Sequence, residues 1–177
     1  MIDEDELKKK NKELDELTQK YKRLLDKKFI SVVNNIEKLL IARNLKFEIL
    51  KNDKEDELRF NNNLKIYFDY KNNLIRLSYK TASGKNSIIT FTLTYIKSIE
   101  YSYTAPYISK ENCSKKLEDE KEFEELKRDI NMIKEQINFI KNSIEFISAT
   151  EQKLFYDNNK SCSLEQFVNF ISTEIKI

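Results

Sequence analysis

The sequence predicts an α+β fold in which long helices flank an antiparallel sheet. Apolar residues recur at helical spacing over residues 3–42 and 114–156, whereas they alternate with polar residues over residues 45–104. A third helical pattern covers residues 163–177. We therefore expect a single domain, residues 1–177, with a long N-terminal helix, an antiparallel β-meander of about four strands, a second long helix and a short closing helix.

The N-terminal helix is expected over residues 3–42. Acidic residues occupy its first turns, where they interact favourably with the helix dipole. Leucines at heptad-like spacing give its first half a narrow apolar stripe, which broadens after Leu25. The first half should therefore contact one neighbour, and the second half should lie in a core.

The segment between residues 45 and 104 is expected to form the sheet. Residues 51–57, "KNDKEDE", indicate a solvated loop, Asn72 and Asn73 indicate a two-residue turn, and Gly84 indicates a second turn. This register makes one face apolar and the other polar. The expected cross-strand pairs are Tyr70 with Ile75, Phe68 with Leu77, Ile66 with Tyr79, Tyr79 with Ile89, and Leu77 with Phe91.

The second long helix has the most regular apolar pattern in the chain. Its stripe alternates steps of three and four and comprises Phe123, Leu126, Ile130, Ile133, Ile137, Ile140, Ile144 and Ile147. Because the two long helices have similar lengths, we expect them to pair within one chain as an antiparallel coiled-coil-like arm. The alternative is pairing between two copies, as a homodimer. Ser163 and Gln166 have the spacing of a capping box that opens the closing helix.

The composition excludes several kinds of chemistry. The chain has no histidine, which removes the usual general base and the commonest metal ligand, and its single glycine leaves no phosphate-binding loop. Cys113 and Cys162 are far apart and are expected to be reduced thiols. Acidic clusters at residues 53–57 and 118–125 indicate solvated surfaces, with carboxylate chemistry as the alternative. We expect a non-enzymatic protein with no catalytic residue, metal or cofactor.

The chain also lacks the patterns of a signal peptide and of a membrane span. Its first residues are acidic, and no apolar run approaches about 18 residues. Frequent Lys, Asn and Ile with little Gly, Ala and Pro is typical of AT-rich codons, which indicates a low-GC genome such as that of a bacterium or its phage. We expect a cytoplasmic protein without a membrane partner, in the host cytoplasm if phage-encoded.

The first candidate site is a basic sheet face. Residues 59–116 carry ten basic and three acidic residues. The candidate residues, which include the lysine of the neighbouring turn, are Lys65, Tyr67, Arg76, Lys80 and Lys85. A basic face with an aromatic ring suits phosphates and stacked bases. The alternative is a solvated face whose lysines discourage edge-to-edge aggregation.

The second candidate site is an aromatic loop around the only proline, Pro106. It contains Tyr101, Tyr103 and Tyr107. The alternation of the preceding strand predicts that Tyr101 and Tyr103 pack at the rim of the core. If the strand has a bulge near Lys97, the rings would instead form an exposed platform, because a bulge reverses the alternation.

These observations favour a non-enzymatic protein–protein interaction module. Its expected partner is another protein, such as a nuclease or a nucleoprotein complex. The occupations considered are a phage or mobile-element inhibitor of a host defence nuclease, an assembly chaperone and a regulator. The alternative is a nucleic-acid-binding protein that uses the basic sheet face.

Overall fold

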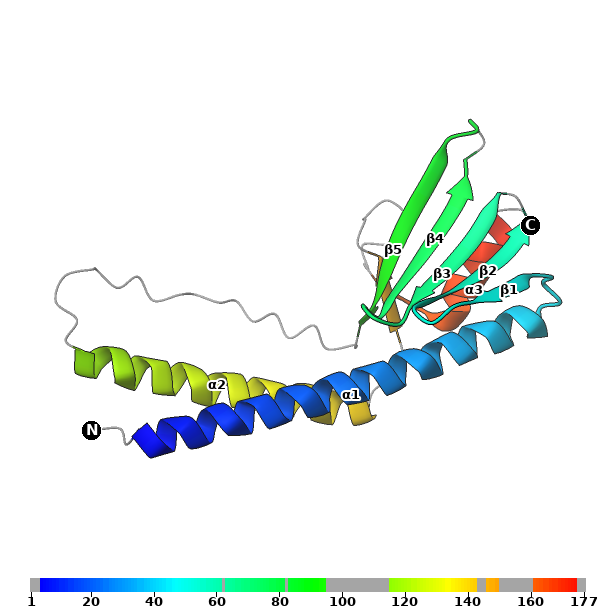
Figure 1. Cartoon of the computed structure of the whole chain (residues 1–177). Helices are drawn as coiled ribbons and strands as arrows, with labels where there is room; N and C mark the ends of the chain where they lie inside the picture. Colours follow the sequence, from blue (N-terminus) through cyan, green and yellow to red (C-terminus); the bar gives the residue numbers. More distant parts are fainter. Residues whose placement is uncertain are drawn as a thin grey trace. The chain divides into compact units, whose positions relative to one another are not determined.

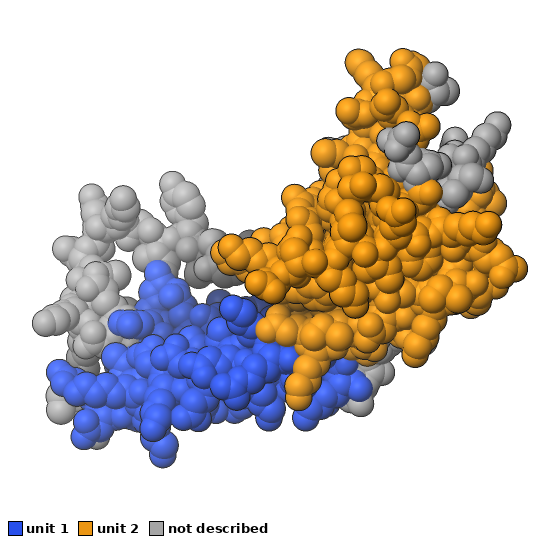
Figure 2. Space-filling view, turned by 45° about the vertical axis from the view of Figure 1, so that its right-hand side comes forward, with its two compact units in different colours: residues 1–24, 97–142 blue, residues 25–96, 143–177 orange. Residues whose placement is uncertain are grey.

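The computed structural model describes residues 4–61, 63–81, 83–94, 115–142, 146–149 and 161–174 (Figure 1). It confirms the α+β fold, with three helices and an antiparallel sheet in the described residues. The chain divides into two compact units (Figure 2). Unit 1 comprises residues 1–24 and 97–142, and unit 2 comprises residues 25–96 and 143–177. The expectation that the chain folds as a single domain stays a prediction.

Helix α1, Glu4–Ala42, matches the expected N-terminal helix. Its end is a Schellman motif, in which the Asn44 N–H donates to the Ile41 carbonyl (2.9 Å) and the Leu45 N–H donates to the Leu40 carbonyl (3.2 Å). Asn44 takes the left-handed conformation that this motif requires, with φ of 56°. An asparagine therefore ends the helix where glycine is more usual, because its side chain tolerates that conformation.

In the described residues the sheet has seven antiparallel strands in sequential order, rather than about four. The strands are β1 Glu48–Lys51, β2 Glu55–Asn61, β3 Leu64–Asp69, β4 Leu74–Lys80, β5 Asn86–Thr94, β6 Phe146–Ala149 and β7 Ser161–Ser163. Part of the expected solvated loop is therefore strand. The turn between β1 and β2 is closed by the Asn52 side chain, whose Oδ1 accepts hydrogen bonds from the N–H groups of Lys54 (3.0 Å) and Glu55 (2.8 Å).

The predicted strand register is wrong by two residues. The β3–β4 turn has four residues, 70–73, because Asp69 Oδ1 accepts from the Lys71 and Asn72 N–H groups (3.1 Å each), and Asn73 takes a φ of 53°. A shift of two leaves each side chain on its predicted face. The observed pairs are Leu64 with Tyr79, Ile66 with Leu77, Phe68 with Ile75, Tyr67 with Arg76, Tyr79 with Ser87, Leu77 with Ile89, and Ile75 with Phe91.

The second long helix is shorter than predicted. Helix α2 covers Lys115–Asn142, and the following β6 pairs with β5, with Ile147 opposite Leu93. The prediction of helix at residues 146–149 is therefore wrong. A short apolar segment rich in Ile and Phe fits a strand as well as a helix, and pairing with the edge of β5 satisfies its backbone groups. Ile144 and residues 150–156 lie outside the described residues.

Unit 2 has one hydrophobic core, on one face of the sheet. Helix α1 contributes Phe29, Val32, Val33, Ile36 and Leu40. Helix α3, Leu164–Glu174, contributes Phe167, whose ring is in edge-to-face contact with the Phe91 ring at 5.0 Å. The predicted capping box at the start of α3 is confirmed. The Ser163 N–H donates to Gln166 Oε1 (2.9 Å), and the Gln166 N–H donates to Ser163 Oγ (3.2 Å).

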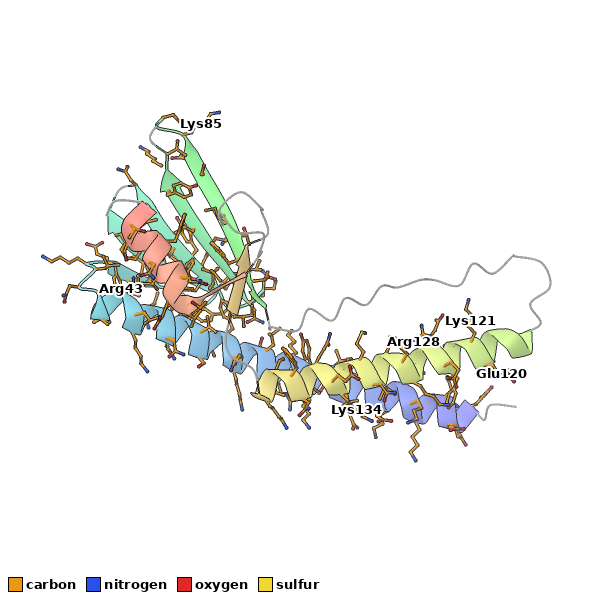
Figure 3. The ribbon with its side chains drawn as sticks, turned by 180° about the vertical axis from the view of Figure 1, so that it is seen from behind. Arg43, Lys85, Glu120, Lys121, Arg128 and Lys134 are labelled. Carbon is orange, nitrogen blue, oxygen red and sulfur yellow. The ribbon has the colours of Figure 1, made fainter. Side chains whose placement is uncertain are left out.

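Unit 1 contains the first part of α1 together with α2. Figures 1 and 3 show these helices side by side and running in the same direction, which differs from the predicted antiparallel pairing. Lys134 Nζ of α2 contacts Glu13 Oε1 of α1 at 2.6 Å. Much of the predicted apolar stripe of α2 is buried, namely Phe123, Leu126, Ile130, Ile137 and Ile140. Coiled-coil packing and a homodimer formed through the helices stay predictions.

Candidate interaction surface

The candidate surface is the face of β1–β5 opposite the α1 and α3 residues of unit 2. The register places on this outer sheet face Glu48, Leu50, Glu55, Glu57, Arg59, Lys65, Tyr67, Asp69, Leu74, Arg76, Ser78, Lys80, Asn86, Ile88, Thr90 and Thr92. Their neighbours along each strand point toward the core. Both described helices of unit 2 pack on that other side.

The structure brings together three of the predicted residues. Tyr67 lies directly opposite Arg76, and the Arg76 guanidinium carbon lies 5.7 Å from the centre of the Tyr67 ring. Lys65 is on the same face, two residues before Tyr67. Lys80 is exposed at the end of β4, and Lys85 is exposed in the β4–β5 turn, at the tip of the hairpin (Figure 3).

Glutamates on β2 pair with this basic group. Glu57 Oε1 contacts Lys65 Nζ at 3.2 Å and Arg59 Nη2 at 2.9 Å, and Arg76 forms an ion pair with Glu55. Burial raises the pKa of Glu57, but the hydrogen bonds from Arg59 and Lys65 outweigh it, so that the pKa lies below its ordinary value. These partners were not predicted, because Glu55 and Glu57 lie in the segment 51–57 that was expected to be a solvated loop.

The outer sheet face is therefore not basic as a whole. Its basic residues are Arg59, Lys65, Arg76 and Lys80, and its acidic residues are Glu48, Glu55, Glu57 and Asp69. Four positive and four negative charges sum to zero. The excess of positive charge along residues 59–116 thus does not become a positive sheet face, because β2 adds acidic residues from outside that range.

Apolar side chains are interspersed among these charges. Leu50 on β1 is 44% exposed, and Ile88 on β5 is 61% exposed. Tyr67, on the intervening strand β3, is half-buried. A tyrosine and an arginine surrounded by other polar residues are typical of protein-binding surfaces.

Asp56, Glu37 and Cys162 of unit 2 lie away from the outer sheet face. Asp56 is only 6% exposed and accepts a hydrogen bond from the Tyr70 hydroxyl (2.8 Å), and burial raises the pKa of the nearby Glu37. Burial also raises the pKa of the Cys162 thiol to about 12, which leaves it unreactive. Within the described residues no three His, Cys, Asp or Glu side chains converge as metal ligands would.

The second candidate site is not among the described residues. Tyr101, Tyr103 and Tyr107 of the aromatic loop, together with Cys113, lie outside the described residues. Neither alternative for the tyrosines, rim packing or an exposed platform, is tested. Among the helices that the structure describes, none combines the length and apolarity needed to cross a bilayer.

The fold and the surface define a class of protein in structural terms. In the part of the chain that the structure describes, it is an α+β fold whose antiparallel sheet has helices packed on one face and ion pairs and apolar side chains on the other. No family model, curated protein or solved structure matches the chain significantly.

Proposed function

We propose that the chain is a non-enzymatic protein–protein interaction module that binds its partner through the outer sheet face. The observation that supports the proposal is the pairing of Arg76 with Glu55 and with the Tyr67 ring, on the sheet face that neither described helix of unit 2 covers. An arginine held by a carboxylate and an aromatic ring loses little conformational freedom on binding, and Tyr and Arg are the most frequent anchors of protein interfaces.

The charges of the face favour a protein partner over nucleic acid. Phosphate backbones are bound by unpaired cations, whose counterion release makes the affinity depend steeply on salt. Lys65 and Arg76 each have a glutamate partner instead, and the face has no net charge. A partner surface with mixed charges and apolar residues fits this arrangement better, since each ion pair can share its hydrogen bonds with the partner.

The proposal is tested by recovering the partner with a tagged chain from the cell in which it is made. We expect one stoichiometric protein, retained after nuclease treatment and lost with Tyr67→Ala, because removing an anchor costs about 2 kcal/mol or more of binding energy. Lys38→Ala is the control, since Lys38 is exposed on α1 on the helix side of unit 2. Equal recovery with Tyr67→Ala and Lys38→Ala would contradict this use of the sheet.

Nucleic-acid binding is tested separately by changing the acidic partners. We expect no salt-sensitive retention of single- or double-stranded oligonucleotides by the wild-type chain. Glu55→Gln combined with Glu57→Gln should introduce such retention, because four positive charges then face two negative ones. If the wild type binds oligonucleotides and Lys65→Ala with Arg76→Ala abolishes the binding, the nucleic-acid alternative is correct.

The biological role of the module is to be inferred from the partner that it binds. A nuclease recovered as the partner would support the role of a phage or mobile-element inhibitor of host defence. An assembly intermediate would support a chaperone, and a transcription or signalling protein would support a regulator. We propose that the chain acts in the cytoplasm, where its partner would have to be found.

A further inference from the structure

The hairpin of β4 and β5 extends beyond the neighbouring strands of the sheet (Figure 1). On one side, the last cross-strand pair of β4 with β3 joins Tyr79 to Leu64. On the other side, the pairing of β5 with β6 begins only at Phe91. Residues 80–81 and 83–86 therefore project from the sheet as a narrow finger, which has no further strand beside it among the described residues.

The finger is closed by hydrogen bonds around Thr81. The Thr81 N–H donates to the Lys85 carbonyl (2.8 Å), and the Lys85 N–H donates to Thr81 Oγ1 (3.2 Å). The Gly84 N–H donates to the Thr81 carbonyl (2.8 Å), and Gly84 has a φ of 79°, which glycine adopts without a steric penalty. A turn held in this way is preorganised, so it loses little conformational freedom when it binds a partner.

The finger carries positive charge and no acidic residue. In the sequence no Asp or Glu occurs between Asp69 and Glu100. Lys80 and Lys85 are exposed, and neither forms an ion pair with the described residues. Ile88 follows two residues after the finger, on the same outer sheet face as Lys80, and is 61% exposed. The hairpin thus presents two unpaired cations next to an apolar side chain.

We propose that the finger enters a cleft of the protein partner whose walls carry carboxylates. A projecting hairpin that is two strands wide reaches into a concave surface, which the broad outer sheet face cannot do. In the cleft, Lys80 and Lys85 form the ion pairs that they lack in the free chain, and Ile88 packs at the rim. A neutral cleft does not suit the finger, because a cation that leaves water needs a group of opposite charge to compensate for its lost hydration.

The inference rests on the proposed function, because it takes the partner to be a protein, and it adds the chemistry of the surface that the partner offers. Nucleic acid is a poorer fit, since proteins that bind it through the backbone neutralise several phosphates and the finger has two cations. The finger does not include Tyr67 or Arg76. The finger and the sheet contact can therefore fail separately.

Charge reversal tests the finger in the same recovery experiment with the tagged chain. Lys80→Glu combined with Lys85→Glu should lower the recovery of the partner by about tenfold or more, because like charges then meet in the cleft. The control is Lys54→Glu combined with Lys71→Glu, which changes the net charge equally at exposed lysines of the turns at the opposite end of the strands. Circular dichroism checks that both variants keep the fold.

Photo-crosslinking identifies the surface of the partner that receives the finger. Asn86→p-benzoylphenylalanine places the crosslinker beside Lys85 without removing either lysine. We expect a crosslink to a partner segment that contains Asp or Glu. Changing those carboxylates to lysine in the partner should restore its binding to the chain with Lys80→Glu and Lys85→Glu, because the two charges have then been exchanged.

Three results overturn the inference: recovery of the finger variant at the level of its control, a crosslinked segment without acidic residues, and an exchange of charges that restores no binding. Retention of an oligonucleotide that the finger variant releases overturns it as well, and recovery of no protein at all contradicts both proposals. If the finger variant loses the partner while Tyr67→Ala keeps it, the finger is confirmed and the sheet contact is wrong. The reverse result shows that the finger alone is wrong.

Discussion

Tyr70→Phe is expected to destabilise unit 2 by removing the hydrogen bond to a buried carboxylate. The Tyr70 hydroxyl donates to Asp56 Oδ2 at 2.8 Å, and Asp56 is 6% exposed. Hydrogen bonds to charged groups contribute about 1.5–3 kcal/mol, and a buried acceptor left without its donor bears the cost of its lost hydration. Because Tyr70 is only half-buried, water can partly replace its hydroxyl, and we expect the lower half of that range.

The packing of the ring should be unchanged in this variant. Phe29 contacts the Tyr70 ring edge-to-face, with ring centres 5.7 Å apart, and a phenylalanine preserves that contact. The control is Tyr79→Phe, since Tyr79 is also half-buried on the core side of the sheet and its hydroxyl forms no hydrogen bond with the described residues. Any effect common to both variants reports the loss of a hydroxyl in general.

Urea unfolding followed by circular dichroism measures the difference. Tyr70→Phe should lower the free energy of unfolding by about 1.5–2 kcal/mol relative to Tyr79→Phe. In a chain of this size the melting temperature should fall by about 2–4 °C for each kcal/mol. If the two variants differ by less than about 0.5 kcal/mol, which is the range of ordinary surface substitutions, the hydrogen bond does not contribute as argued.

Two further predictions concern α2 and α3. Lys134→Glu breaks the ion pair with Glu13 and should speed hydrogen exchange of the α2 amides. Adding Glu13→Lys to the same chain restores a pair of opposite charges and should slow the exchange again. If neither change alters the exchange rate, this ion pair does not stabilise α2. The hydrogen bonds from Lys10 and Lys134 lower the pKa of Glu13 from 4.5 to about 2, so the contribution of Glu13 is complete above pH 4.5 and is lost as the pH falls toward 2. Ser163→Ala should cost about 1 kcal/mol in urea unfolding, while Ser163→Thr, which can still cap α3, should cost much less.

The faces of the sheet could be predicted because alternation with a period of two survives an error of two residues in register. The true turn at residues 70–73 depends on Asp69 accepting two backbone hydrogen bonds, which no apolar pattern reveals. Lys65, Tyr67 and Arg76 were nevertheless assigned to the correct face, because their core-side neighbours alternate with them. The residues of the candidate surface were thus partly accessible from the sequence.

The electrostatic character of the surface could not be predicted in the same way. It depends on Glu55 and Glu57, which precede the basic segment 59–116 in the sequence and which β2 places beside β3. A signal was present, because Asp56, Leu58 and Phe60 alternate with Glu55, Glu57 and Arg59, but a buried aspartate interrupts the apolar row. The Tyr70 hydroxyl, fourteen residues further on, donates a hydrogen bond to that aspartate.

The division of the chain affects the order in which its parts can form during synthesis. Each unit is assembled from two separate stretches, residues 1–24 with 97–142 and residues 25–96 with 143–177. Since the ribosome releases the polypeptide from its N-terminus, all of unit 1 emerges before α3 does. The apolar face of strands β1–β5 therefore stays incomplete until α3 has been synthesised and Phe167 can pack on Phe91. A stop codon placed after residue 142 would yield a chain whose sheet keeps the core residues of α1 but lacks those of α3, so that Phe91 loses its contact with the Phe167 ring.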